Sequence, residues 1–454
     1  MSRNEESPPR PSLADEYGNL HHVGEELARG GQGVVSRTTD DGLAVKQPLN
    51  ASGEPDKDVD LRARFQNIRQ LPLPPRIPVS LPLAIMRDKP GYVMRLLNGM
   101  KPFEMFDMNG TTQKELRDSL EKGTLKCPQW LAKIPDPKMC LMLLHYAATG
   151  STRRRLFALS RCASILARLH GAGLVYGDIS PKNVFVGEGN SREVWLIDAD
   201  NLRFEISEGG SAVYTPHYGA PEIVQARDGA RPRTDCWAFA VLAFQSLSLG
   251  HPFIGRKVLE PDSDEGGWDT DPLGAGNVPA DLDEQAYAGY LPFVDDEADD
   301  SNAAVGGSCL PRELVATAGL RRLFQETFGT GRTQPHRRPA MVFWALELAK
   351  ACDCSLVCPN CDMSYFGDEH VQCPYCKAMR PAFVRAGTPR WKVLVAGATE
   401  SALPHRLFYP FSFEHNDDTE YEAVFNFEAK TALPVRGTKP FPENLAFEFV
   451  EAAK

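Results

Sequence analysis

The sequence predicts an α+β protein with two lobes, the first small and strand-rich and the second larger and helical, followed by a cysteine-rich module and a β-rich end. Three observations carry this prediction: alternating apolar runs up to about residue 97, helical periodicity beyond it, and closely spaced cysteine pairs near residue 360. At 454 residues the chain exceeds one compact core, because domains average roughly 150 residues. The predicted units are a flexible tail at 1–20, an N-terminal lobe at 21–97, a C-terminal lobe at 98–350 with an acidic insertion at about 257–305, a cysteine module at 351–382 and a β-rich domain at 383–454.

The predicted N-terminal lobe begins with a hairpin. The runs "ELARGGQGVVSR" and "LAVKQ" have the pattern of strands, and Asp41-Gly42 between them is a turn signal. Leu61, Phe65 and Ile68 then recur at helical spacing, and the prolines that follow cannot continue that helix. The strand pair "LAIM" and "GYVMRLL" completes the lobe.

The predicted C-terminal lobe is mainly helical. One helix face is marked by Ala158, Cys162, Ile165 and Leu169. The run "CWAFAVLAFQSLSLG" is apolar on all sides, as expected for a helix at the centre of a lobe. Residues 261–300 include 13 acidic residues and no Lys or Arg, which predicts an acidic surface insertion.

The overall charge excludes some classes of partner. A formal net charge of −10 does not provide the basic footprint that general nucleic-acid or anionic-membrane binders need. The sequence has no run of 18 apolar residues, and its first residues lack the apolar segment of a secretion signal. We therefore expect a cytoplasmic protein with no nucleic-acid and no membrane partner.

Four of the 11 cysteines have the spacing of a metal site, C-x2-C-x11-C-x2-C. They are Cys358, Cys361, Cys373 and Cys376. Two tight turns of this kind present four thiolates to one tetrahedral ion, so the spacing predicts a zinc ribbon with structural Zn²⁺ that supplies the folding energy of the module. A pair of redox dithiols is the alternative, whereas the clustering argues against a disulfide framework.

Two motifs in the first lobe suit phosphate binding. "LARGGQGVV" places glycines at a strand turn, where the absence of Cβ atoms lets the backbone close over phosphates. Lys46 follows on the next strand, 13 residues after Gly33. Each motif alone is weak, because a ligand-free glycine turn and an exposed strand lysine have the same appearance.

The order of the motifs resembles that of the protein kinase superfamily from about Leu27 to Ala349. "YGDISPKN" stands in the place of the catalytic loop, "LIDAD" in that of the D-F-G segment and "YTPHYGAPE" at the end of the activation segment. "DCWAFA" matches the start of the central helix, so Asp235 should be structural. "PHRRP" supplies Arg338, which by resemblance pairs with Glu222. The resemblance implies a two-lobed kinase fold with ATP and Mg²⁺ between the lobes.

The resemblance also implies a role for each site residue. The implied residues are Asp178 for orienting the acceptor hydroxyl, Lys46 and Lys182 for phosphate charge, Asn183 and Asp198 for Mg²⁺ with Asp200 as a further candidate ligand, and Gly30, Gly31, Gly33, Val35, Met94, Arg95 and Leu97 around the nucleotide.

One departure from the family concerns Lys46. Asn67 stands where the family has the helix glutamate that pairs with the strand lysine. Asp58, Asp60 or Glu54 could substitute only if the helix is shifted or rotated, and a Lys46 left unpaired would be less well positioned. In "DAD", Asp200 is either a second metal ligand or a solvated carboxylate.

A second departure lies in the catalytic loop. Tyr176-Gly177 replace the usual His-Arg, which removes the arginine that binds a phosphorylated activation segment. Activity is therefore expected not to depend on phosphorylation within residues 199–219. Ser180 replaces the lysine of Ser/Thr kinases, and Lys182 stands where tyrosine kinases have an arginine, so a tyrosine acceptor is the alternative. Thr215 stands where Ser/Thr kinases have a threonine that contacts the catalytic aspartate, which favours a Ser/Thr acceptor.

The expected function is a protein Ser/Thr kinase. The alternatives are a pseudokinase scaffold, which would bind nucleotide and assemble partners through the zinc ribbon and C-terminal domain, and a small-molecule kinase. A kinase followed by a zinc ribbon and such a tail is similar to bacterial eukaryotic-like Ser/Thr kinases, including those of tellurite-resistance or stress gene clusters. That narrower resemblance implies bacterial signalling, with a cognate phosphatase and a von Willebrand factor A-like protein as partners.

Overall fold

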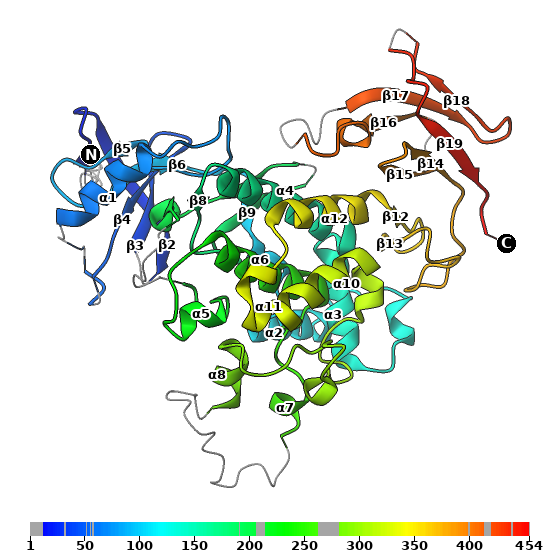
Figure 1. Ribbon diagram of the computed structural model, residues 1–454, viewed down its shortest axis with the longest axis horizontal. Coiled ribbons are helices and arrows are strands. Elements are labelled where there is room, and N and C mark those ends of the chain that lie inside the picture. Colours follow the sequence, from blue (N-terminus) through cyan, green and yellow to red (C-terminus); the bar gives the residue numbers. More distant parts are fainter. Residues whose placement is uncertain are drawn as a thin grey trace, which may run out of the picture.

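The fold is given by a computed structural model, which describes residues 12–30, 33–50, 52–54, 56, 59–189, 191–205, 214–261, 281–397, 400–412, 419–436 and 439–453. The N-terminal sheet and the β-rich C-terminal region lie at opposite ends of the helical lobe (Figure 1). Within the described ranges, no helix has the length and apolar character needed to cross a membrane.

The N-terminal lobe is a six-stranded antiparallel sheet with the order β1-β2-β3-β4-β6-β5. Its strands are β1 (Ser12–Ala14), β2 (Leu20–Gly30), β3 (Gly33–Thr38), β4 (Leu43–Gln47), β5 (Ala84–Ile85) and β6 (Tyr92–Arg95). The Asp41-Gly42 hairpin joins β3 to β4 as predicted, and Gly42 has a left-handed φ of 97°. Phe65 and Ile68 of α1 (Val59–Arg69) are buried, so the predicted helix face is confirmed.

The predicted flexible tail at 1–20 is too long. β1 adds to the edge of the sheet, and Asp15 is only 1 % exposed. Its carboxylate contacts His21 Nε2 at 3.0 Å and accepts a hydrogen bond from the Asn19 side chain. A three-residue edge strand is too short to show the alternation of apolar and polar residues that predicts a strand. The polar composition of the segment therefore led to the prediction of a flexible tail.

The C-terminal lobe is built from helices around three short strands and a two-stranded pair. Its helices are α2 (Gly110–Glu121), α3 (Pro137–Ala148), α4 (Ser151–Gly171), α5 (Pro221–Val224), α6 (Pro232–Ser248), α7 (Arg256–Leu259), α8 (Leu282–Tyr287), α9 (Arg312–Val315), α10 (Ala318–Gln325), α11 (Gly331–Thr333) and α12 (Met341–Asp353). Its strands are β7 (Met100–Pro102), β8 (Leu174–Val175), β9 (Val184–Gly187), β10 (Val194–Leu196) and β11 (Arg203–Phe204), in the orders β10-β9-β7 and β11-β8. Almost every residue of α6 is buried, which confirms the central helix.

The predicted acidic insertion at 257–305 is only partly a surface feature. Residues 262–280 lie outside the described residues. Beyond them, Phe293 is 2 % exposed and Asn302 is fully buried. The Asn302 amide donates to the carbonyls of Phe253 and Pro292 at 3.0 and 2.8 Å. The acidic residues alternate with apolar ones that join the core, which a count of charges does not reveal.

The cysteine module is continuous with the C-terminal lobe. The predicted boundary after residue 350 falls inside α12. Trp237 of α6 and Met363 of the module belong to one hydrophobic cluster. The module strands β12 (Ser355–Val357) and β13 (Ser364–Phe366) form a hairpin, and Ser364 N–H donates to Ser151 Oγ at the start of α4 at 2.9 Å. The module is thus a part of the lobe rather than a separate unit.

The C-terminal region is β-rich, as predicted. It contains two three-stranded sheets, β15-β14-β19 and β16-β17-β18. The strands are β14 (Phe383–Gly387), β15 (Lys392–Ala396), β16 (Glu400–Pro404), β17 (Thr419–Asn426), β18 (Thr431–Pro434) and β19 (Ala446–Val450). A second hydrophobic cluster joins them to Leu346 and Ala349 of α12. Buried Asp353 accepts hydrogen bonds from Trp391 Nε1 and Arg406 Nε, at 2.8 and 2.7 Å.

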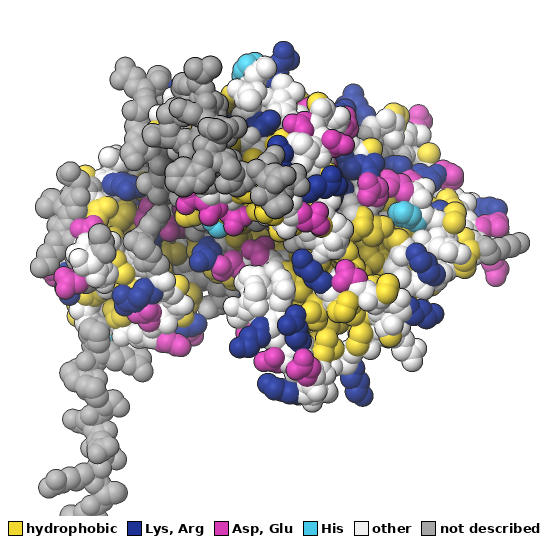
Figure 2. All heavy atoms as spheres, turned by 90° about the horizontal axis from the view of Figure 1, so that it is seen from below, with side chains coloured by type: hydrophobic (Ala, Val, Ile, Leu, Met, Phe, Trp, Pro, Cys, Tyr) yellow, Lys and Arg dark blue, Asp and Glu magenta, His cyan; other side chains and the backbone are white. Residues whose placement is uncertain are grey.

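One face of the molecule has mixed charge. In Figure 2, the coloured side chains show Lys and Arg interspersed with Asp and Glu, with apolar side chains between them. The described side chains of this face therefore do not form the continuous basic patch that nucleic-acid binding needs.

Candidate active site and metal centre

Lys46 and Tyr92 form the N-terminal side of the candidate active site. They are directly opposed across antiparallel strands β4 and β6, so their side chains leave the sheet on the same face. Both are buried, at 5 % and 1 % exposure. Phe65 of α1 packs edge-on against Tyr92, with ring centroids 4.8 Å apart. The strand register therefore aims an ammonium group and a phenol at one place.

Asp198 and Asp200 lie at that place. Asp198 has a left-handed φ of 58°, which Asp tolerates better than most residues, and it precedes a short 3-10 helix at Ala199–Asn201. Lys46 Nζ forms an ion pair with Asp198 and another with Asp200 Oδ2, the second at 2.8 Å. Tyr92 Oη donates to Asp200 Oδ1 at 2.8 Å. Lys46 is therefore paired with two carboxylates, although the helix glutamate of the family is missing.

The partners of Lys46 lie in the segment 197–201, which we call the metal loop, and not in helix α1. Asn67 is exposed, and the described side chains of α1, residues 61–69, are apolar, neutral or basic. Instead, Arg64 of α1 donates from Nε to the Asp200 carbonyl at 2.8 Å and from Nη2 to Asn201 Oδ1 at 2.7 Å. Asp200 is 9 % exposed, which excludes the solvated carboxylate.

The catalytic loop lies between β8 and β9. Asp178 is 5 % exposed, and its two oxygens accept separate hydrogen bonds. Thr215 Oγ1 donates to Oδ1 at 2.7 Å and Asn183 Nδ2 donates to Oδ2 at 3.1 Å. The contact predicted between Thr215 and Asp178 is confirmed. These two bonds fix the carboxylate of Asp178 in one orientation.

Two side chains, Asp235 and Tyr176, fix the catalytic loop. Asp235 of α6 accepts hydrogen bonds from the N–H groups of Tyr176 and Gly177, at 2.8 and 2.9 Å, which confirms its structural role. Buried Tyr176 donates from Oη to the carbonyl of Ile197, the residue before Asp198. Gly177 has a left-handed φ of 85°. Tyr176 therefore connects the catalytic loop with the metal loop.

The electrostatics of the site are dominated by burial and by acidic groups. Burial raises the pKa of Asp178, against the hydrogen bonds that it accepts. Burial also raises the pKa of Asp198, with Lys46 opposing and Asp200 adding to the effect. Burial alone would lower the pKa of Lys46, but the two carboxylates together raise it. Three carboxylates against one ammonium leave a formal excess of two negative charges.

This donor set fits a magnesium ion and a nucleotide. Carboxylate and amide oxygens are the ligands that Mg²⁺ prefers, and the excess negative charge is what a divalent cation neutralises. Asp198 and Asn183 are the residues that would hold the ion, and Lys46 would contact phosphate oxygens. Lys46 and Asn183 are buried and Asp198 is partly buried, which is consistent with a site that restricts the access of water.

The predicted nucleotide-binding residues lie along the sheet near both ends of β4: Gly33 precedes Val34, which pairs with Gln47, whereas Arg95 pairs with Leu43 at the other end. A Cβ on Gly33 would lie 2.7 Å from the Gln47 carbonyl oxygen, so glycine is required there by the approach of β3 to β4. Gly31 lies outside the described residues. Val35 pairs with Lys46 across β3 and β4, and Met94 is buried on β6. Their roles toward adenine and phosphate stay predictions.

Two predicted residues are exposed. Arg95 ends β6 with its guanidinium 5.1 Å from the Trp195 ring, and Leu97 follows it. The Lys182 side chain is 72 % exposed, with Nζ 3.7 Å from Glu104 Oε1. An exposed lysine can reach a phosphate by rotation, but at rest this one is directed at a carboxylate.

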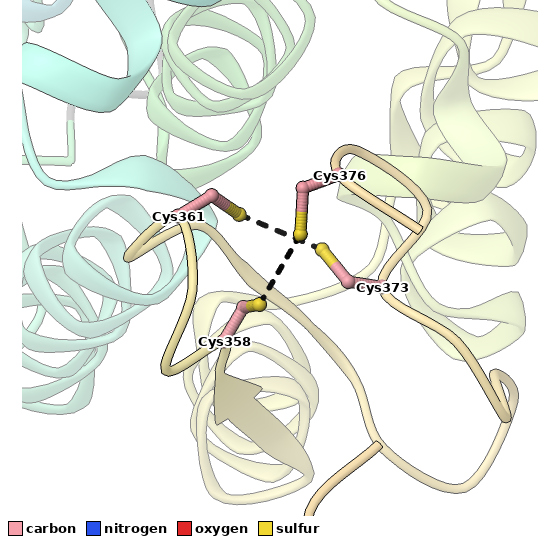
Figure 3. Close-up of side chains that lie close together, drawn as sticks. All are labelled: Cys358, Cys361, Cys373 and Cys376. Carbon is pink, nitrogen blue, oxygen red and sulfur yellow. Dashed lines mark hydrogen bonds between the residues drawn. The ribbon is translucent and has the colours of Figure 1, made fainter. Parts of the chain in front are cut away.

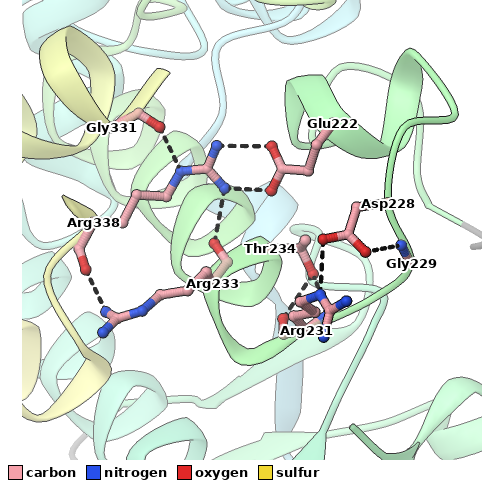
Figure 4. A network of polar contacts seen from close by, with 8 residues as sticks. All are labelled: Glu222, Asp228, Gly229, Arg231, Arg233, Thr234, Gly331 and Arg338. Carbon is pink, nitrogen blue, oxygen red and sulfur yellow. Dashed lines mark hydrogen bonds and ion pairs between the residues drawn. The ribbon is translucent and has the colours of Figure 1, made fainter. Parts of the chain in front are cut away.

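The end of the activation segment is fixed by a buried ion pair. Arg338 donates from both terminal nitrogens to the two oxygens of Glu222, at 2.6 and 2.8 Å, which confirms the predicted pair (Figure 4). Its Nε donates to the Gly331 carbonyl at 2.8 Å. The side chain of Arg338 has no exposed surface, so the charge is neutralised entirely within the protein.

The four predicted cysteines converge on one point from two turns (Figure 3). Their sulfurs all lie within 4.8 Å of one another, with Cys358–Cys376 at 3.5 Å and Cys361–Cys373 at 3.7 Å. Four sulfurs around Zn²⁺ at about 2.3 Å are separated by about 3.8 Å, so the set fits a tetrahedral ion. A hydrogen bond from Cys361 lowers the pKa of the Cys373 thiol to about 5, which favours a thiolate ligand.

Sequence reasoning missed Tyr92 and Arg64. Tyr92 looks like an ordinary apolar strand residue, and only its register opposite Lys46 reveals its role. Arg64 belongs to no motif and looks like an ordinary helix arginine in the sequence. One signal could have indicated the contacts of Lys46. The described part of this helix has no acid, whereas the metal loop has a second acid, Asp200, which can replace the helix glutamate.

A strand-rich lobe lies over a helical lobe, and a lysine, an Asp-Asn loop and an acidic loop meet between them, which is similar to the arrangement in protein kinase domains. The family model described as "Protein kinase domain" matches residues 142–265, which include the catalytic and metal loops. This match supports the protein kinase superfamily for that part of the chain.

Curated relatives support the same conclusion over a similar share of the chain. Death-associated protein kinase dapk-1 of Caenorhabditis elegans is 37 % identical over 90 residues, 19 % of this chain and 6 % of the relative. Ribosomal protein S6 kinase alpha-2 of Mus musculus is 34 % identical over 104 residues, 22 % and 14 %. G2-specific protein kinase fin1 of Schizosaccharomyces pombe is 34 % identical over 91 residues, 19 % and 12 %. The chain thus spans less than a sixth of the length of each of these relatives.

Proposed function

We propose that this chain is an ATP- and Mg²⁺-dependent protein kinase that transfers the γ-phosphate to Ser or Thr. The observation that carries the proposal is the hydrogen-bonded unit of Asp178, Asn183 and Thr215, placed next to the Lys46–Asp198 pair. The family model that matches these loops, and the similarity to kinase relatives, support it.

In this proposal the residues act mainly by positioning and electrostatics. Bound Mg²⁺·ATP supplies the phosphoryl group and neutralises part of its charge. Asp178 orients the acceptor hydroxyl and accepts its proton at a carboxylate oxygen. Thr215 and Asn183 keep that carboxylate from rotating. Lys46 binds phosphate oxygens, and Lys182 turns from Glu104 toward the developing charge.

The proposal includes a catalytic loop that works without activation-segment phosphorylation. Gly177 provides no charge for a phosphate, and its left-handed backbone is compatible with glycine above all other residues. The narrower resemblance adds a cognate phosphatase and a von Willebrand factor A-like protein as candidate partners. The zinc module and the C-terminal domain are the parts that we propose for partner binding.

The test compares the wild type with Asp178→Asn. Each is incubated with labelled ATP, Mg²⁺ and a generic protein substrate, and phosphoamino acids are identified. We expect label on Ser or Thr, lowered by about 10³-fold or more in Asp178→Asn with nucleotide binding retained. Asp118→Asn, an exposed acid on α2, is the matched control and should retain full transfer.

Two other outcomes contradict the proposal in different ways. Nucleotide binding without transfer to any substrate indicates the pseudokinase scaffold. Transfer that reaches only small molecules, or that persists unchanged in Asp178→Asn, indicates another kind of phosphotransferase or a contaminant.

A further inference from the structure

Two carboxylates compete for Lys46, and the structure distinguishes them. Asp198 is held by Lys46 on one oxygen, Oδ1, and its side chain is 21 % exposed. Asp200 is held on both oxygens, by Lys46 at 2.8 Å and by Tyr92 at 2.8 Å, and its side chain is 11 % exposed. Both acceptor oxygens of Asp200 are therefore occupied by the protein, whereas Asp198 keeps one oxygen free of Lys46.

The backbone of Asp200 is also fixed. Its carbonyl accepts from Arg64 Nε, and the next residue, Asn201, accepts from Arg64 Nη2. Helix α1 therefore grips the peptide that bears Asp200. Tyr92, the second holder of the carboxylate, is itself packed against Phe65 of the same helix. Lys46, Tyr92 and Arg64, which form these hydrogen bonds with Asp200, all belong to the N-terminal lobe.

We propose that Asp200 is a positioning residue that permanently anchors Lys46, and that it is not a metal ligand. In this arrangement α1 acts on Lys46 through Arg64 and Asp200 and supplies no acid of its own. Asp198 is then the carboxylate that exchanges Lys46 for the cation when nucleotide binds. This inference deepens the proposed kinase function and rests on it for the identity of the ligand.

The first measurement is nucleotide binding without metal, in the presence of EDTA, with a fluorescent ADP analogue as the probe. Asp200→Asn should weaken binding about tenfold, because Lys46 loses a charge-assisted hydrogen bond that orients it. In a Lys46→Met background the same substitution should change binding less than about twofold, because the two residues act as one unit. Tyr92→Phe should show a smaller loss in the same direction.

The second measurement separates positioning from metal binding. Phosphoryl transfer is titrated with Mg²⁺ at saturating ATP. Asp198→Asn should raise the Mg²⁺ concentration at half-maximal rate by about tenfold or more, whereas Asp200→Asn should leave it unchanged within about twofold. An equal rise for both variants would show that Asp200 is a ligand, which overturns the proposal.

Controls keep this inference distinguishable from the kinase proposal. Tyr365→Phe removes a buried hydroxyl that has no hydrogen-bond partner among the described residues, and it should alter neither measurement. If the wild type binds no nucleotide, the kinase proposal fails. The proposed anchoring of Lys46 by Asp200 is then tested by thermal unfolding of the wild type, Lys46→Met, Asp200→Asn and the double variant. Non-additive losses of Tm support the anchor; additive losses refute it.

Discussion

The candidate active site between the two lobes, here called the interlobe site, and the four-cysteine site both bring together groups that can carry negative charge next to a cation. They differ in the chemical groups that they use and in where these lie in the sequence. The cysteine site takes four ligands from two turns within 19 residues of sequence and brings their sulfurs within 4.8 Å. The interlobe site collects residues from β4, β6, the catalytic loop and the metal loop, and it already holds a cation of its own, Lys46. From this difference we expect a site with an internal counter-ion to stay folded without its metal, and a site of thiols alone to depend on it.

The largest expected effect comes from removing metal. Chelation should release one Zn²⁺ per chain and unfold the cysteine module, because structural zinc contributes on the order of 10 kcal/mol of apparent binding free energy. Cys358 and Cys373 belong to the main hydrophobic cluster, so the Tm of the helical lobe should also fall. Hydrogen exchange of residues 355–380, zinc release and calorimetry measure these changes.

Removal of metal from the interlobe site provides the complementary test. Removal of Mg²⁺ should leave exchange of the residues around Lys46 unchanged, because Lys46 neutralises the acids there. Cys361→Ser should reproduce the effect of chelation on the module, and Cys127→Ser, an exposed cysteine elsewhere, should not. A module that keeps its protection after zinc loss would remove the proposed difference between the sites.

The buried ion pair of Arg338 and Glu222 shows what an internal counter-ion contributes where no metal is expected. Glu222→Gln leaves the fully buried Arg338 charge without its partner and should lower the free energy of unfolding by about 3 kcal/mol. Glu313→Gln breaks the exposed contact with Arg321 and should cost less than about 1 kcal/mol. Urea unfolding with zinc content recorded in parallel measures both; equal losses would show that burial of the pair has no effect.

The smallest expected effect lies in the activation segment. Ser207→Ala, Ser211→Ala and Tyr214→Phe remove hydroxyls from the segment and should each change transfer less than about twofold, because Gly177 offers a phosphate no arginine. Thr215→Val, which removes a hydrogen bond to Asp178, is the contrasting variant and should lower transfer about tenfold. Loss of activity after phosphatase treatment would contradict phosphorylation-independence.

The two sites also differ in how far the sequence predicts them. The cysteine set was predictable because its geometry is local: four ligands in two short turns have few other arrangements. The members of the interlobe site were named by resemblance, and the Thr215–Asp178 and Arg338–Glu222 pairs are confirmed. The partner of Lys46 was not predictable in this way, because it depends on the register of β4 with β6 and on where a loop 152 residues away turns back.

Errors in the fold have a common physical origin. Residues 12–20 and 286–305 were assigned to the surface from average composition, although single buried residues such as Asp15 and Asn302 tie them to the core. The cysteine module was separated from the lobe because its motif is self-contained. Its contact with Ser151 at the start of α4 depends on tertiary packing that spacing does not encode.

The backbone at Gly177 has a consequence for engineering. A side chain there would combine a left-handed φ of 85° with a Cβ only 3.3 Å from the Asn201 carbonyl oxygen. Reinstating an arginine by one substitution would therefore strain the loop by about 1–3 kcal/mol, at the position that must stay still for catalysis. For the proposed kinase, a phosphorylation-gated version would therefore require redesign of the whole loop from Val175 to Asp178, and the proposed ungated state would be protected against reversal by a single mutation.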